Sequence, residues 1–187
     1  MPQLSTGFKK ILIYTLTITL LSVAYFVYAK SLYPPTEESE TFLSELGEGF
    51  GEIALWLLLF VYLRTAMKLL LGRGSIAKRL IPEYSAPVND APFKMVLRFL
   101  DRTHIYFGIA AIAVMVLHIA LLGVPMQILF FPAVIALIVW QGLFGLFISW
   151  RYSPKQVKKF SYLVHAQFVT GIMLGVFSYF GHLLIDD

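Results

Sequence analysis

The chain has 187 residues, of which 58% are hydrophobic and only 14% are charged, with a formal net charge of +4 at pH 7. Soluble domains carry about a quarter charged residues, so this composition, with a mean hydropathy of +0.76, is typical of an integral membrane protein. There is no cysteine, which excludes disulfides, thiolate metal sites, iron–sulfur clusters and the covalent attachment of a c-type haem.

Five apolar stretches are long enough to cross a bilayer as helices, which takes about 20 residues each. The length allows one domain, so we expect an all-α membrane bundle of about five transmembrane helices over residues 1–187. The first stretch follows Lys9 and Lys10 but is too long for a signal peptide and lacks a small-residue cleavage site. We interpret it as a retained span. The expected spans are 11–29, 53–71, 105–122, 128–149 and 162–185.

The connections between these spans alternate in charge. Basic residues precede the first span and follow the second and fourth, whereas the connection after the first span and the tail are acidic. Lys and Arg collect on the cytoplasmic side of a membrane, so we expect a cytoplasmic N-terminus and an outer C-terminus. The basic residues are Lys9, Lys10, Arg73, Lys78, Arg79, Lys94, Arg98, Arg102, Arg151, Lys155, Lys158 and Lys159, and the acidic ones are Glu37, Glu38, Glu40, Glu45, Glu48, Glu52, Asp186 and Asp187.

Two connections have further features. Pro34 and Pro35 end the first helix, and Thr36 with the acidic residues after it predicts a short outer helix. The segment 82–92 contains three prolines and predicts an extended cytoplasmic loop. Asp90, Ala91 and Pro92 then form a helix-start signal, so we expect residues 93–102 to begin the third span below the membrane surface.

The four histidines of the chain all lie on the third and fifth spans, and ionisable side chains inside spans are usually functional. Because these two spans run in the same direction, His104 and His165 lie near the cytoplasmic edge and His118 and His182 near the outer edge. Facing helices would form an inner pair, His104 with His165, and an outer pair, His118 with His182. A haem iron takes two axial ligands, commonly imidazoles, so the pattern predicts two haem b groups with these histidines as iron ligands.

The spacing of the histidines suits the third span better than the fifth. His104 and His118 are 14 residues apart, which gives a rise of ~21 Å and a difference in direction of ~40°. His165 and His182 are 17 residues apart, and their directions differ by ~100° on a straight helix. A curved helix or an irregular first turn at His165 would absorb the mismatch; otherwise the chain would hold one haem.

Several neighbours of the histidines are candidate cofactor contacts. Gly108 lies one turn after His104 and would let a flat macrocycle approach the helix, although glycine also serves ordinary packing in lipid. Arg102 and Arg151 lie at the level of inner haem propionates, as do Arg98 and Lys155, although the positive-inside rule also accounts for them. Other residues have a packing or surface interpretation beside the cofactor one: Arg64, Phe107, Trp140, Gln141, Phe168, Gly171, Gly175, Phe177 and Phe180.

The stretch Asp101-Arg102-Thr103-His104 … Val116-Leu117-His118, with a second histidine pair on the span after next, resembles the ferric reductase-like transmembrane domain. That superfamily includes NADPH oxidases and bacterial haem-binding reductase subunits. The resemblance covers roughly residues 98–185. It implies one haem in each leaflet, with electrons passing outward from the cytoplasmic side. The spacing on the fifth span is longer than is usual in that family, and other dihaem cytochromes b, such as the b561-like group and the anchors of respiratory dehydrogenases, share the four-histidine picture.

The resulting hypothesis is a dihaem b-type cytochrome, the membrane subunit of a redox complex or a ferric reductase-like protein in the inner (plasma) membrane. The chain has no dinucleotide motif and no sixth span, so we expect electrons to come from a redox partner protein or quinol rather than from NAD(P)H. The partners expected are the lipid bilayer and a larger membrane complex, with no nucleic acid. Two alternatives stay open: a transporter in which the histidines relay protons or ions, and a structural membrane subunit without a cofactor.

Overall fold

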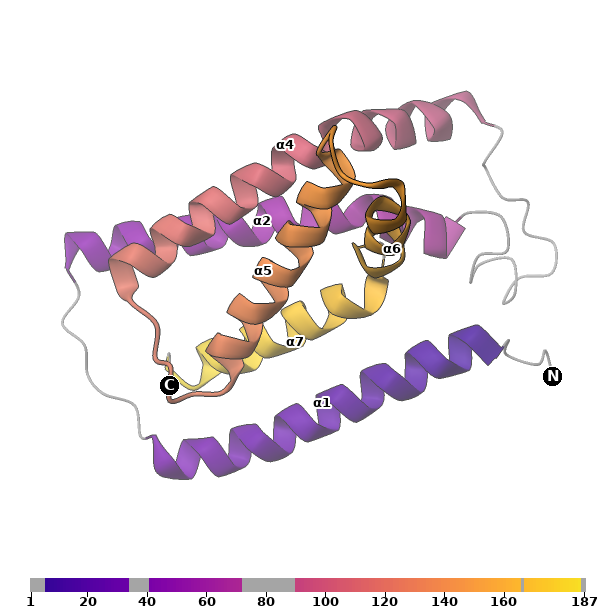
Figure 1. Cartoon of the computed structure of the whole chain (residues 1–187). Helices are drawn as coiled ribbons and strands as arrows, with labels where there is room; N and C mark the ends of the chain where they lie inside the picture. The colour runs from indigo at the N-terminus through magenta and orange to yellow at the C-terminus, as the bar shows by residue number, and fades with distance from the viewer. Residues whose placement is uncertain (1–5, 34–40, 72–89, 166, 186–187) are drawn as a thin grey trace.

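The computed structural model describes residues 6–33, 41–71, 90–165 and 167–185, and in these ranges the chain forms helices and their connections, with no strand. Figure 1 labels the helices in chain order. They are α1 (Thr6–Leu32), α2 (Phe42–Leu71), α4 (Ala91–Leu122), α5 (Phe130–Ser149), α6 (Lys155–His165) and α7 (Phe168–Leu183).

Four of these helices are long and apolar enough to cross a membrane, or five spans result if α6 and α7 count as one bent span. The described residues are thus all-helical, with four or five helices that could span a membrane, as the sequence predicts. Many large apolar side chains on the helices are exposed, for example Leu20 at 68% and Val27 at 65%. Exposed apolar surface of this kind suits lipid, because lipid tails are as apolar as the side chains that face them.

The helix α2 begins eleven residues earlier than expected and absorbs much of the acidic connection. Thr41 and Ser44 cap the N-terminus of this helix with two reciprocal hydrogen bonds, as in a capping box. The Thr41 amide donates to Ser44 Oγ (2.9 Å), and the Ser44 amide donates to Thr41 Oγ1 (3.2 Å). Glu45, Glu48 and Glu52 therefore lie on α2, and placing them in a loop or a separate short helix was wrong. The expected helix start at Thr36 lies outside the described residues.

The early start of the third span is confirmed. Asp90 is the N-cap of α4 with an extended backbone (φ −71°, ψ 136°), and Pro92 lies in the first turn, where a missing N–H costs no hydrogen bond. Residues 93–102 are helical, and α4 ends at Leu122 with Gly123 as its C-cap, whose φ of 76° is readily adopted only by glycine. Most of the proline-containing loop expected before α4 lies outside the described part of the chain.

The largest departure from the sequence prediction is the fifth span. It is not one helix over 162–185 but two, α6 and α7, bent by 51° at a break after His165. Gln167, the N-cap of α7, is extended (φ −77°, ψ 117°). The break contains neither proline nor glycine, so local propensity did not signal it; side-chain and backbone hydrogen bonds from α5, described below, flank it on both sides.

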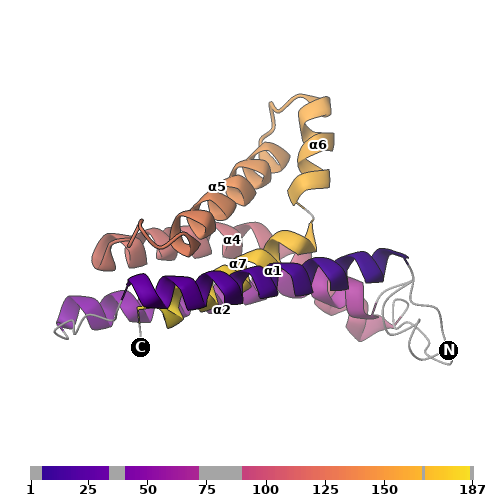
Figure 2. The same cartoon turned by 90° about the horizontal axis from the view of Figure 1, so that it is seen from below.

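The helices pack in neighbouring pairs around the centre of the bundle. The helix α2 runs antiparallel along α4, α5 packs on α6 and α7, and α1 packs on α7. Figure 2 shows α5 and α6 rising out of the layer that contains the other helices. The helices α4 and α7 point the same way, as the alternation of spans requires.

A small buried cluster joins the end of α1 to the start of α5 and the end of α7. Its centre is Ala29, Ile128, Phe130 and Leu184. The ring of Phe130 lies 4.9 Å from Tyr25, 5.9 Å from Phe177 and 6.0 Å from Phe180, measured between centroids. Phe177 and Phe180 therefore serve helix packing here.

We predict that Ala29→Leu destabilises the bundle by about 1–3 kcal/mol, because added methylenes overpack a full site and Ala29 is completely buried. Ala24→Leu is the matched control, since Ala24 lies on the same helix with an exposed side chain. Thermal unfolding of both variants in detergent checks the prediction. Equal unfolding temperatures for the two variants would contradict the docking of α1 through this cluster.

Candidate functional site

The four histidines lie in two pairs, each with one member on α4. The ring centroids of His104 and His165 are 5.8 Å apart, and those of His118 and His182 are 6.0 Å apart. His104 and His118 come from α4, His165 is the last residue of α6, and His182 lies in the last turn of α7. These are the two pairings that the sequence favours, and all four side chains are half-buried.

The separation within each pair is that of two imidazoles on opposite sides of one metal ion. An imidazole nitrogen binds a metal at about 2 Å, so two axial rings on one ion have centroids roughly 6 Å apart. The ring planes are inclined by 82° in the His104–His165 pair and by 28° in the His118–His182 pair.

The break between α6 and α7 removes the spacing problem of the fifth span. On one straight helix, His165 and His182 would point in directions ~100° apart. In the structure they stand on two helices inclined by 51°, so each ring reaches a different histidine of α4. The irregularity expected at His165 is thus found, as a full break rather than a distorted turn.

Three of the four histidines have their Nδ1 atom hydrogen-bonded to a backbone carbonyl. His118 Nδ1 lies 2.8 Å from the Gly47 oxygen on α2, and His165 Nδ1 lies 3.0 Å from the Gln141 oxygen on α5. His182 Nδ1 lies 2.8 Å from the Ser178 oxygen on its own helix. A carbonyl only accepts, so Nδ1 must carry the proton. Nε2 then keeps its lone pair, as a neutral metal-binding imidazole requires.

The Nε2 atoms of these three histidines make no hydrogen bond to any residue that the structure describes. His104 is different: its Nδ1 is buried without a hydrogen bond of normal geometry, although the backbone of Val61 interacts with the imidazole ring. The site therefore has one histidine whose ring is less firmly oriented than the other three.

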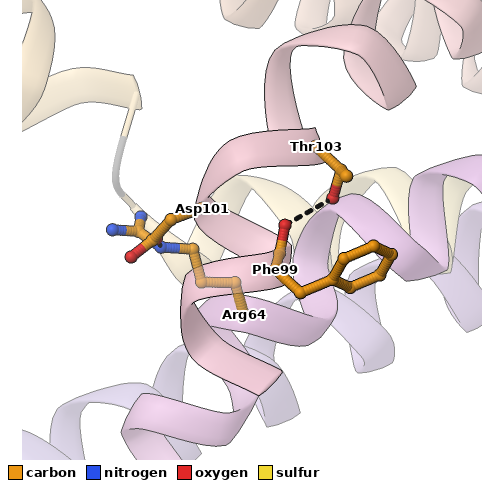
Figure 3. A network of polar contacts seen from close by, with 4 residues as sticks. All are labelled: Arg64, Phe99, Asp101 and Thr103. Atoms are coloured by element: carbon orange, nitrogen blue, oxygen red, sulfur yellow. Dashed lines mark hydrogen bonds and ion pairs between the residues drawn. The ribbon is translucent and has the colours of Figure 1, made fainter. Parts of the chain in front are cut away.

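Next to His104, Arg64 of α2 forms an ion pair with Asp101 of α4. Figure 3 shows this pair and, on the other side of the helix, the hydroxyl of Thr103, which donates to the Phe99 oxygen (2.8 Å). The sequence analysis offered a surface or a cofactor interpretation for Arg64, and it did not predict the ion pair with Asp101. The pair joins α2 to α4 three residues before His104.

Gln141 is the polar centre of α5 and contacts both sides of the break. Its carbonyl accepts from His165 at the end of α6, and its side-chain Nε2 donates to the Thr170 hydroxyl in the first turn of α7. That hydroxyl donates to the carbonyl of Gln167 (2.8 Å), and Tyr62 of α2 also interacts with Thr170. The sequence analysis favoured packing over a cofactor contact for Gln141 and did not predict its hydrogen bonds, because a single glutamine in an apolar helix carries no spacing signal.

The remaining candidates of the sequence analysis lie apart from the histidine rings. An added Cβ at Gly108 or Gly175 would meet nothing within 4 Å, which leaves open space along α4 and α7. Arg102 and Arg151 are exposed and make no hydrogen bond or ion pair with other described residues. Arg102 lines a shallow surface hollow of about 270 Å³ together with Met95, Arg98 and Phe99.

One aromatic contact was missed by the sequence analysis. The ring of Phe131 lies edge-on to His182, with centroids 5.7 Å apart. Residues 130 and 131 are both phenylalanine, and only the packing of α5 on α7 shows that the second one contacts the histidine.

Among the described residues, no group of three or more His, Cys, Asp or Glu side chains gathers where it could hold a metal ion. A haem iron does not need such a group, because the porphyrin supplies the other ligands and the protein adds one or two axial ones. Comparison with known proteins found no matching family, no matching curated protein and no matching solved structure.

We predict that Gln141→Leu and Thr170→Val each destabilise the bundle, and that the double variant loses less than the sum of the two. The expected coupling is about 0.6 kcal/mol, the average for interhelical hydrogen bonds in membranes. Thr103→Val is the matched control, because its hydroxyl bonds only within its own helix. Unfolding in detergent gives the free energy of unfolding of all four variants. If the losses of the two single variants add up to that of the double variant, the two side chains are not coupled across the break.

Proposed function

We propose that this chain is a membrane electron-transfer protein with two b-type haems, each held axially by one histidine pair. One observation carries the proposal: two pairs of histidines, each contributed by two helices, have rings about 6 Å apart. The Nδ1–carbonyl bonds of three of these rings support it further, since metal-bound histidines almost always donate their other N–H to such an acceptor.

In this proposal the two haems lie in opposite halves of the bilayer. The 14 residues of α4 between His104 and His118 give a rise of ~21 Å. The basic residues near α6 and the start of α4 favour the cytoplasmic side for the His104–His165 pair. The haem supplies the one-electron chemistry when bound, and the chain supplies oriented imidazoles, a fixed distance between the two pairs and an apolar surrounding.

The resemblance to the ferric reductase-like transmembrane domain rests on the histidine pattern alone, and it supports the same proposal. We further propose that electrons enter from a redox partner protein or a quinol at the cytoplasmic pair and leave at the outer pair. The plasma membrane is the proposed location. Arg102 and Arg151, being exposed and without ion-pair partners among the described residues, are available for haem propionates at that side.

A proton relay through the histidines has less support. It would need polar groups between the two pairs. On α4 the only such side chain between His104 and His118 is Tyr106, which is 75% exposed. Between His165 and His182 the chain has Gln167, Thr170, Ser178 and Tyr179 but no acidic residue. The Nδ1 atoms of three histidines end on backbone carbonyls, which cannot take up and pass on a proton. If function persisted in a variant without the four histidines, that result would instead favour a purely structural subunit.

The test is the absorption spectrum of the purified protein, oxidised and dithionite-reduced, with a pyridine haemochromogen count. We expect a low-spin b-type α-band and about two haems per chain. A colourless protein from haem-replete cells would overturn the proposal.

The histidine variants test the pairing itself. His118→Ala and His182→Ala should each lose the same haem, and the double variant should lose no more than either single one. His104→Ala and His165→Ala should lose the other haem in the same way, and a variant combining His104→Ala with His118→Ala should lose both. Haem counts that follow a different grouping would contradict the pairs.

A further inference from the structure

Two histidines on different helices contact their neighbouring helix in the same way: each bonds to a backbone carbonyl and packs on the residue four positions later. His118 bonds to the carbonyl of residue 47 and packs on residue 51 of α2; His165 bonds to the carbonyl of residue 141 and packs on residue 145 of α5. Residues 51 and 145 are both glycines, four positions after the carbonyl that accepts the hydrogen bond.

The glycines are in direct contact with the rings. A Cβ added at Gly51 would lie 2.8 Å from both Cε1 and Nδ1 of His118. A Cβ added at Gly145 would lie 3.0 Å from Cε1 of His165 and 3.5 Å from its Nδ1. A methyl group at Gly51 would force the ring to move, and one at Gly145 would crowd it.

Helix geometry explains why a glycine is needed at this position. A helical carbonyl at position i bonds to the N–H at i+4 but keeps a second lone pair. The side chain at i+4 points back toward the N-terminus and covers the turn that contains this carbonyl. Without a side chain there, the second lone pair is open to a donor from a neighbouring helix.

We propose that Gly51 and Gly145 are positioning residues, each of which exposes one helical carbonyl to a histidine ring and so fixes the Nδ1–H tautomer with Nε2 free for iron. The inference rests on the proposed haem function and deepens it. His104 supplies an internal comparison: the backbone of Val61 interacts with its ring, the residue four positions later, Thr65, is not a glycine, and Nδ1 forms no hydrogen bond of normal geometry.

Ordinary helix packing is the competing explanation for these glycines. The contacts of the neighbouring glycines on the same helices distinguish the two explanations. On α2, a Cβ at Gly47 would meet the side chains of Leu121 and Leu122, and a Cβ at Gly49 would meet nothing within 4 Å. On α5, a Cβ at Gly142 would meet only Cδ1 of Ile112, at 3.1 Å. Among the glycines that the structure describes, only Gly51 and Gly145 lie against a histidine.

The first experiment compares four alanine variants of the haem-loaded protein by low-spin ferric EPR and by redox titration. We expect Gly51→Ala to shift the signal and potential of the His118–His182 haem, or to lose that haem, while the other haem is unchanged. Gly145→Ala should affect only the His104–His165 haem, and less strongly. Gly49→Ala and Gly142→Ala are the controls and should leave both haems unchanged.

The haems are assigned with His118→Ala and His104→Ala. Equal effects of Gly51→Ala on both haems, or equal effects of Gly51→Ala and Gly49→Ala, would overturn the inference and leave the haem proposal standing. A wild-type protein without haem would instead end the haem proposal.

A second experiment needs no haem and covers the case in which Gly51→Ala folds poorly. If the methyl group clashes with the ring, Gly51→Ala should lower the unfolding temperature in the wild-type background and have little effect once His118→Ala has removed the ring. The same holds for Gly145→Ala with His165→Ala. An undiminished loss in the ring-free background would assign the glycines to helix packing and overturn the inference.

Discussion

A lipid bilayer supplies no hydrogen-bond partner, so each polar side chain inside it must find one within the protein. The helices of this chain have few polar groups to offer, and the backbone carbonyls already bond within their own helices. Three of the four histidines therefore take the second lone pair of carbonyls at Gly47, Gln141 and Ser178. Two further polar contacts join side chains of different helices, Arg64 with Asp101 and Gln141 with Thr170.

The same constraint connects the helix break to the candidate site. Breaking a helix inside a bundle releases backbone groups that must be satisfied elsewhere. At the junction of α6 and α7, Gln141 accepts from His165 and donates to Thr170, whose hydroxyl donates to the Gln167 carbonyl. One glutamine thus stabilises a break that lets His165 face His104 and His182 face His118, the two histidines of α4. The geometry of both pairs depends on this junction.

The two pairs are not equivalent in how they are held. Both histidines of the His118–His182 pair bond to carbonyls, whereas in the other pair only His165 does so and His104 lies beside the Arg64–Asp101 ion pair. Hydrogen bonds to the ligating side chains and nearby charges are the means by which a protein tunes a bound metal. Two identical sets of ligands would therefore stand in different surroundings.

The sequence by itself determined the apolar character of the spans, the helical class, the early start of α4 and the position of each histidine along the chain, because hydropathy and the order of residues along a helix are local properties. It could not determine that residues 42–52 belong to α2, since three glycines and three glutamates there resemble a loop. Nor could it place the break after His165 or identify the carbonyls that accept hydrogen bonds from the histidine rings. Those features depend on which helix face meets which, and backbone carbonyls carry no residue signature, so only the tertiary packing of α2 on α4 and of α5 on α6 and α7 decided them.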